Sequence, residues 1–431
     1  MALPTWLAKR ARDPLYANGA ALVANAGLSA ALGFLFWVIA ARRFNADALG
    51  LGAAIVSAAT LAALLGKAGF DAAVIRYAPS CDRQGAAKLL VRASLATFVL
   101  TAIVAGGLLV LARFGVPALG PLLTPFYAAG FVVLAAVTSF SWILDAYFIS
   151  EQRSGAVLLR NLAFNGAKLG VPAFIAYEWG GRAVPFAWLV GLVASLAVTL
   201  TLLPRVLGRH RASAAPPTRG AAGYSARNYA LNLSEFVPGL VLPLLVLNAL
   251  GAEENARFYL AWTVAAVAFL ASKAVAQSAF AAMVRGGDER GAILKGCALS
   301  AVVLAPGVIV LHFGAQIVLG LFGPHYVTAA PLLRVLALSI PAVALTNIYL
   351  SYLKARDEGW ELTLLPVGSL ALLLVLMPIA ITRGGIEAVA LVWLAVQAGF
   401  GLYAAARLLL RLRSVHHASP RTGLRRHPHE G

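Results

Sequence analysis

Apolar stretches of about 20 residues or more recur along the whole chain of 431 residues, and they constrain its fold more than any other feature. A helix of that length rises through roughly 30 Å, the thickness of the hydrocarbon core of a bilayer. Hydrophobic residues make up 61% of the chain and charged residues only 12%, against about 25% charged residues in soluble domains. The pattern excludes an ordinary soluble enzyme and predicts an all-α integral membrane protein.

The apolar stretches divide into twelve predicted transmembrane helices. They cover 18–41, 49–70, 86–112, 126–148, 157–177, 183–206, 230–250, 258–283, 293–313, 330–353, 362–381 and 386–410. The first stretch follows Lys9, Arg10 and Arg12, as a secretory signal would, but it is longer than a signal core and ends at Arg42 and Arg43 instead of small residues. We therefore expect an uncleaved first helix, preceded by a segment that lies along the membrane surface.

The basic residues are distributed unevenly between the two sides of this arrangement. The formal net charge of +18 would suggest a nucleic-acid partner in a soluble chain. Here 25 of the 35 Lys and Arg residues fall on the side that holds both termini, seven on the other side and three inside helices. The positive-inside rule therefore predicts cytoplasmic termini in the inner (plasma) membrane, with no nucleic-acid partner. The two cysteines, Cys81 and Cys297, lack metal-ligand spacing, so no metal or other cofactor is expected.

The longest interior connection separates two groups of six helices. It is rich in Ala, Pro, Ser and Arg, a composition typical of a flexible linker. We expect an N-terminal lobe over 1–206, a cytoplasmic linker over 207–227, a C-terminal lobe over 228–410 and a basic disordered tail over 411–431.

The start of the second lobe weakly repeats the start of the first. The stretch 18–41 matches 228–249 in length, and each is followed by an acidic residue, Asp47 or Glu253. Lys67 and Lys273 then fall within about two positions of each other. Because both copies begin on the same side, the repeats are parallel, and they predict two pseudo-symmetric six-helix lobes.

Several segments of the first lobe resemble a known transporter family. They are Asn25, GFLFW at 33–37, AARRF at 40–44, Gly50 and GFDAAVIRYAP at 69–79. On these segments the chain resembles the polysaccharide exporters, or O-antigen flippase-like oligosaccharide flippases, of the multidrug/oligosaccharidyl-lipid/polysaccharide (MOP) exporter superfamily. The motif identifies the branch of the superfamily better than a substrate, and the second lobe matches in organisation alone.

The resemblance implies a V-shaped, alternating-access transporter, a MATE-like fold, with a central cavity lined mainly by helices 1, 2, 7 and 8. It implies a polyprenyl-diphosphate-linked oligosaccharide as cargo, flipped to the outer leaflet for cell-surface polysaccharide or lipopolysaccharide biosynthesis. A polysaccharide polymerase is an implied partner beside the membrane lipids. Such a cargo needs a wet, cationic cavity, and charges inside helices are the natural candidates.

Two candidate substrate-binding residues lie in the eighth predicted helix. Lys273 falls near the middle of the bilayer, where an unpaired ammonium facing lipid costs several kcal/mol, so it should face a cavity or a partner. We prefer substrate contact; the alternative is a buried contact with a carboxylate or carbonyl. Gln277, one turn further on, shares the same face.

Three further basic residues are weaker candidates. Lys67 lies about one turn from a helix end, where its stem can reach the interface, but its repeat partner Lys273 favours substrate binding. Arg76 is either an interface charge or a diphosphate contact at the cytoplasmic mouth. Lys168, which we also consider for coupling or gating, lies within GAKLG at 166–170, a small-residue spacing that favours packing inside the lobe. It would then balance Asp145 or Glu235 within the protein.

The seventh predicted helix contributes the other candidates. Glu235 precedes Pro238, which favours a bend, so we consider both for ion coupling or gating, with a paired structural charge as the alternative. Asn232 and, in the first helix, Asn25 are candidate hydrogen-bond partners for sugars or for neighbouring helices.

Other functions remain open at this stage. A membrane polymerase or glycosyltransferase is less favoured, because the predicted outer connections are short and hold no set of nucleophile, base and orienting residue; an enzyme is therefore not expected and no catalytic residue is assigned. A multidrug exporter of the same superfamily would favour acidic residues in its cavity, whereas the charges within the predicted helices are lysines. A lipid II-type flippase would need the same cationic cavity.

Overall fold

A computed structural model describes residues 14–115, 117–174, 177–212, 221–284, 289–356 and 360–417, and within these ranges the chain is helical and contains no strand. The helices of the first half are α2 (Pro14–Arg43), α3 (Ala46–Gly66), α4 (Phe70–Tyr77), η1 (Ala78–Ser80), α5 (Arg83–Gly115), η2 (Pro117–Leu123), α6 (Pro125–Ser150), α7 (Ser154–Phe174), η3 (Tyr177–Arg182) and α8 (Ala183–Arg209). The helices of the second half are α9 (Ala221–Leu250), α10 (Ala252–Val284), α11 (Glu289–Phe313), α12 (Ala315–Gly320), η4 (Pro324–Ala329), α13 (Ala330–Arg356) and α14 (Glu361–His417).

Ten helical segments of the described ranges are long and apolar enough to cross a membrane. This confirms a helical membrane protein, while the count of twelve and the side of the termini stay predictions. Two features account for the difference. First, α14 is one continuous segment where two helices were predicted, although its backbone leaves the helical conformation at Gly384 and Gly385, inside the predicted gap. Second, α7, which carries Arg160 and Lys168, is not among the ten.

Other boundaries also differ from the sequence-based expectation. The helix predicted over 49–70 ends at Gly66, and the chain turns through Ala68 and Gly69, both with positive φ, before α4 begins. Helix α9 begins at Ala221 instead of residue 230, so the connection between the halves is shorter than the predicted linker. Residues 1–13, which hold most of the predicted surface segment, residues 213–220 of that linker and the tail from residue 418 lie outside the described residues.

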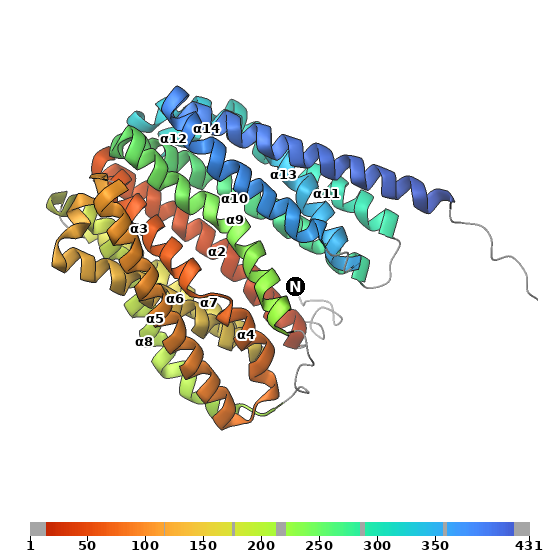
Figure 1. The fold of residues 1–431 in the computed structure, drawn as a ribbon, viewed down its shortest axis with the longest axis horizontal. Helices are drawn as coiled ribbons and strands as arrows, with labels where there is room; N and C mark the ends of the chain where they lie inside the picture. The colour runs from red at the N-terminus through yellow and green to blue at the C-terminus, as the bar shows by residue number, and fades with distance from the viewer. Residues whose placement is uncertain are drawn as a thin grey trace, which may run out of the picture.

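The helices of each half pack mainly among themselves, and α3 connects the two groups (Figure 1). We call α2 to α8 the first lobe and α9 to α14 the second lobe. Helix α3 packs against α5 and α6 of the first lobe and against α9 and α10 of the second. It is the most buried of the ten apolar helices, whereas α2 is the least buried.

The two lobes meet most closely at the end of the molecule opposite the termini, which we call the far end. There Asn255 Nδ2 of α10 donates a hydrogen bond to the Gly50 carbonyl of α3 (2.7 Å), and Arg42 Nε donates one to the Leu321 carbonyl (2.8 Å). The rings of Trp37 and Tyr259 also pack across the lobes, with centroids 4.6 Å apart. At the termini end, beside α3, Tyr229 of α9 donates a hydrogen bond to the Leu65 carbonyl (2.8 Å). These contacts leave α2 bound to the second lobe through its far half.

Candidate functional site

A cavity of about 500 Å³ opens among the helices of the second lobe. Its walls come from α9, α10, α13 and α14, and Ser57 of α3 is the single lining residue from the first lobe. We expected a cavity lined mainly by helices 1, 2, 7 and 8, which correspond to α2, α3, α9 and α10. Helices α9 and α10 do line it, α3 contributes one residue, and the described part of α2 contributes none. The physical reason is that α3 packs directly on α9 and α10, which fills the space between the lobes along that side.

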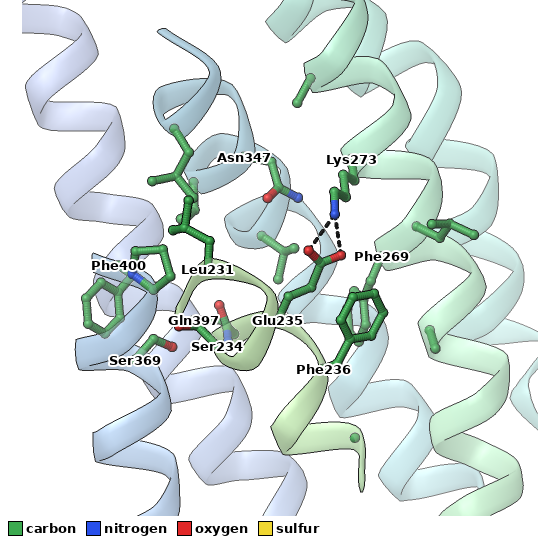
Figure 2. A pocket seen from close by; sticks show the side chains of 18 of the residues that line it. Leu231, Ser234, Glu235, Phe236, Phe269, Lys273, Asn347, Ser369, Gln397 and Phe400 are labelled. Carbon is green, nitrogen blue, oxygen red and sulfur yellow. Dashed lines mark hydrogen bonds and ion pairs between the residues drawn. The ribbon is translucent and has the colours of Figure 1, made fainter. Parts of the chain in front are cut away.

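Glu235 and Lys273 contact each other in the lining of this cavity (Figure 2). The Lys273 ammonium donates to both carboxylate oxygens of Glu235, with Nζ to O distances of 2.5 Å, so the pair links α9 to α10. The two side chains are 35% and 37% exposed, which means that water or a ligand can reach them. The structure thus combines the two sequence-based alternatives for Lys273, because this residue both lines the cavity and pairs with a carboxylate.

The cavity lining carries more positive than negative charge. Besides the Glu235–Lys273 pair it includes Lys354, at the end of α13, and Gln277 lies one turn beyond Lys273 as predicted. Two ammonium groups and one carboxylate give the lining a net charge of +1. The charged residues are confined to the part of the cavity nearer the termini end.

Apart from the charged groups, the cavity is lined by aromatic, polar and aliphatic side chains. Along α10 the lining changes from Tyr259 and Trp262 to Lys273, over a rise of roughly 21 Å. Trp393, Phe269 and Phe236 add further rings, and uncharged polar groups line the spaces between them. These polar residues are Ser57, Ser234, Thr263, Thr346, Asn347, Ser351, Ser369 and Gln397.

Four of the predicted substrate contacts lie elsewhere. Lys67 pairs with Asp71 (2.7 Å) and lies over the ring of Trp142 at the end of α3. Arg76 is a partly buried residue of α4. Substrate contact by these two residues stays a prediction.

The two asparagines are also placed away from the cavity lining. Asn232 of α9 donates to the Asn228 carbonyl one turn back, and Asn25 is partly buried in α2. The Asn25 Oδ1 atom is buried without a hydrogen-bond partner. Their predicted role with sugars is untested, and no residue among the four lines the cavity.

Lys168 belongs to α7 in the first lobe and Pro238 to α9 in the second. Lys168 is buried in the first lobe, where it contacts three aromatic rings; Asp145 pairs with Arg160 and Glu235 with Lys273, so the proposed balance of Lys168 with either carboxylate is wrong. Pro238 lies inside α9, which runs as one helix through it, beside a small space shared with α14. A gating role for Pro238 stays a prediction.

Sequence reasoning missed Lys354, because its position at the end of a predicted helix identified it only as a positive-inside charge. Arg160 was also one of the 25 basic residues counted on the side of the termini, whereas the structure buries this residue completely between α6, α7 and α8. Arg160 pairs with Asp145, donates to Thr199 Oγ1 (2.7 Å) and donates to Ser141 Oγ (2.9 Å). The signal for this cluster in the sequence is that two neighbouring helices carry an acidic and a basic residue, Asp145 and Arg160.

The fold is similar to solved structures of MATE transporters. A multidrug resistance MATE family transporter of the MOP superfamily, in its inward-facing conformation, is 17% identical over 91% of this chain and 96% of its own, with a TM-score of 0.69. The outward-facing conformation of such a transporter gives 16% identity over 94% and 98% of the two chains and a TM-score of 0.57.

A third similar structure is a MOP superfamily transporter from Pyrococcus furiosus. It is 15% identical over 94% of this chain and 97% of its own, with a TM-score of 0.62, and its description states that the reverse polarity of its binding pocket suggests a different function. No family model matches the sequence, and no curated protein matches it. At these identities the likeness establishes a MATE-like fold, and together with the ten apolar helices it identifies a multi-pass membrane protein.

Proposed function

We propose that this protein is an alternating-access flippase that moves a polyprenyl-diphosphate-linked oligosaccharide from the cytoplasmic to the outer leaflet of the plasma membrane. The observation that carries the proposal is the excess positive charge of the cavity, in which Lys273 and Lys354 face a single carboxylate. A diphosphate requires cationic partners in a medium of low dielectric constant. The aromatic and polar walls suit sugar rings, which have apolar faces and hydroxyl edges.

Alternating access is supported by the unequal closure of the two ends. The lobes are sealed at the far end by the Trp37–Tyr259 contact and the Asn255–Gly50 hydrogen bond, while the half of α2 near the termini is little buried. The higher TM-score to the inward-facing relative agrees with this pattern. We interpret the arrangement as a state open toward the termini end, which the charge distribution predicts to be cytoplasmic. Assembly with a polysaccharide polymerase is part of the proposal.

A multidrug exporter is the second candidate, because Glu235 beside Phe236 and Phe269 would suit an amphiphilic cation. The test is deletion of the gene followed by complementation with wild type, Lys273→Ala, Lys273→Arg and, as a matched control, Lys88→Ala on the exposed face of α5. The readout is polyprenyl-diphosphate-linked glycan retained in the inner leaflet, at equal protein levels.

We expect glycan to accumulate on deletion, and we expect wild type, Lys273→Arg and Lys88→Ala to reverse the accumulation while Lys273→Ala does not. If Lys273→Ala also reversed the accumulation, the cationic cavity would not be required for flipping. No accumulation on deletion, together with greater sensitivity to cationic drugs, would establish the exporter instead. A lipid II-type flippase would be recognised by accumulation of the peptidoglycan precursor.

A further inference from the structure

The Glu235–Lys273 pair bears on how an anion can enter the cavity at all. The Lys273 ammonium donates to both oxygens of the Glu235 carboxylate, so two of its three N–H groups are already used. An anion that binds Lys273 has to displace Glu235 or approach within contact distance of it. Either outcome leaves a carboxylate in contact with a bound polyanion, and like charges at that distance repel each other.

The surrounding groups determine what happens to that carboxylate. The charged residues near Glu235 are Lys273 from α10, Lys354 from α13 and, close enough to act electrostatically on Lys354, Arg227 near the start of α9. Among the described lining residues α14 and α3 contribute no charged group, and Tyr259 lies near the other end of the cavity. Arg227 has an interaction of its own. Glu235 is therefore the one acid in the lining that can become neutral when an anion arrives.

The charges of the lining and of the proposed cargo determine how many protons should bind together with the ligand. A diphosphate that is esterified at both ends carries one negative charge on each phosphate. With Glu235 ionised the lining has a net charge of +1, which is one charge too few, whereas with Glu235 protonated the two ammonium groups match the two phosphates. We propose that the cavity binds its anionic ligand together with one proton, which is taken up by Glu235 as Lys273 is released to the anion.

This inference rests on the proposed function for its choice of ligand, and it names Glu235 as a proton-binding site in that cycle. Proton and ligand bind together and do not compete, so each strengthens the binding of the other. The bound state holds one more proton than the free state, and the affinity for the anion therefore falls as the pH rises, by at most about tenfold per pH unit.

The test uses the full-length protein in nanodiscs and farnesyl-diphospho-N-acetylglucosamine, a diphosphate diester whose charge is constant between pH 5 and 8. Isothermal titration calorimetry in buffers of different ionisation enthalpy gives both the affinity and the number of protons taken up per bound ligand. The proteins compared are wild type, Glu235→Gln, Lys273→Gln and the control Glu254→Gln, whose carboxylate pairs with Arg257 outside the cavity.

Near pH 7 we expect wild type and Glu254→Gln to take up close to one proton per ligand and to bind more weakly as the pH rises. Glu235→Gln should bind at least as tightly as wild type, with no proton uptake and no pH dependence. Lys273→Gln should bind about tenfold or more weakly yet still take up the proton, which keeps the test decisive if Glu235→Gln fails to fold. Binding by wild type without proton uptake, or uptake that persists in Glu235→Gln, overturns the inference and leaves the anion site intact.

The remaining outcomes separate this inference from the function on which it rests. Absence of binding by wild type at every pH removes the anion site and the proton site together. Proton-linked binding in a protein that does not flip lipid-linked glycan in cells supports the inference while contradicting the proposed function.

Discussion

Lys168 is held inside the first lobe by aromatic rings. Its ammonium lies 4.2 Å from the ring centroid of Trp188, 4.9 Å from that of Phe164 and 5.0 Å from that of Phe36. No carboxylate pairs with it among the residues that the structure describes. Each such contact contributes about 0.5–2 kcal/mol, which offsets only part of the desolvation of a buried ammonium. The charge of Lys168 therefore destabilises the folded protein, whereas its apolar stem fills the space between α2, α7 and α8.

We therefore expect Lys168→Met, which keeps the length and removes the charge, to raise the midpoint of thermal unfolding in detergent by a few degrees. Lys168→Ala should lower the midpoint, because it leaves a void among the three rings. Both variants should flip glycan as wild type does when their levels are equal. Loss of transport by a stable Lys168→Met protein would contradict this assignment and would give the buried charge a role in coupling.

For the Arg160 cluster we expect the opposite effect, because this buried cation has a partly buried carboxylate as its partner. Arg160→Met leaves Asp145 unpaired between α6 and α7, and we expect it to destabilise the protein by about 3–5 kcal/mol. Asp145→Leu combined with Arg160→Met should recover much of that loss, since the two substitutions remove the charge pair together. Denaturation in a mild detergent measures the difference. A double variant no more stable than Arg160→Met alone would contradict this account of the cluster.

At the scale of helices, the approach of α3 to α10 depends on one glycine. A methyl group added at Gly50 would lie 1.7 Å from the Ala252 carbonyl oxygen and 2.9 Å from the Ala256 nitrogen, both of them backbone atoms of α10. These backbones can meet only because Gly50 has no side chain, and the same contact allows Asn255 to reach the Gly50 carbonyl. Gly50 belongs to the segments that resemble the flippase family, and the structure supplies its physical reason.

Gly50→Ala should therefore separate the lobes at the far end and shift the population toward the outward-open state. The measurement is the labelling rate, by a membrane-impermeant thiol reagent added from outside, of a cysteine introduced at Tyr259, in a background with Cys81 and Cys297 replaced by Ala. We expect at least a severalfold increase in the rate. Gly106→Ala is the matched control, because a methyl group there meets nothing within 4 Å. An unchanged rate in Gly50→Ala would mean that this contact does not hold the far end closed.

Elements that depend on local sequence properties could be predicted, whereas elements that depend on contacts between helices could not. The apolar stretches were predictable, because span length and hydrophobicity are local properties, and the glycines at 384 and 385 interrupt α14 where two helices were expected to separate. The end of α3 was not predictable, because it depends on packing: a methyl group on Gly66 would lie 2.2 Å from Thr101 Oγ1, so α5 approaches closely there. The chain then turns at Ala68, a residue with no intrinsic preference for positive φ.

At the scale of the whole molecule, the two lobes are less equivalent than the sequence repeat suggests. The repeat places Lys67 and Lys273 around one axis, yet Lys273 lines the cavity and Lys67 pairs with Asp71 at the end of α3. The cavity belongs almost entirely to the second lobe, for which the sequence motif offered least support. Sequence similarity between repeats identified related backbone positions, whereas the surroundings of each side chain depend on helix packing that a single sequence does not specify.

This asymmetry predicts unequal effects of the two lysines on transport. Lys67→Ala removes an ion pair with Asp71 at the turn between α3 and α4, outside the cavity lining, so flipping should stay within about twofold of wild type. Lys273→Ala should reduce flipping at least tenfold, because it removes one of the two ammonium groups and leaves Glu235 facing the anion alone at that point of the wall. Both are measured as initial rates of glycan translocation in proteoliposomes at matched protein content, with Asp71→Asn as the companion of Lys67→Ala. If Lys67→Ala and Lys273→Ala impaired flipping equally, the ligand would have to contact both lobes during the cycle, and the cavity of this state would be only part of its binding site.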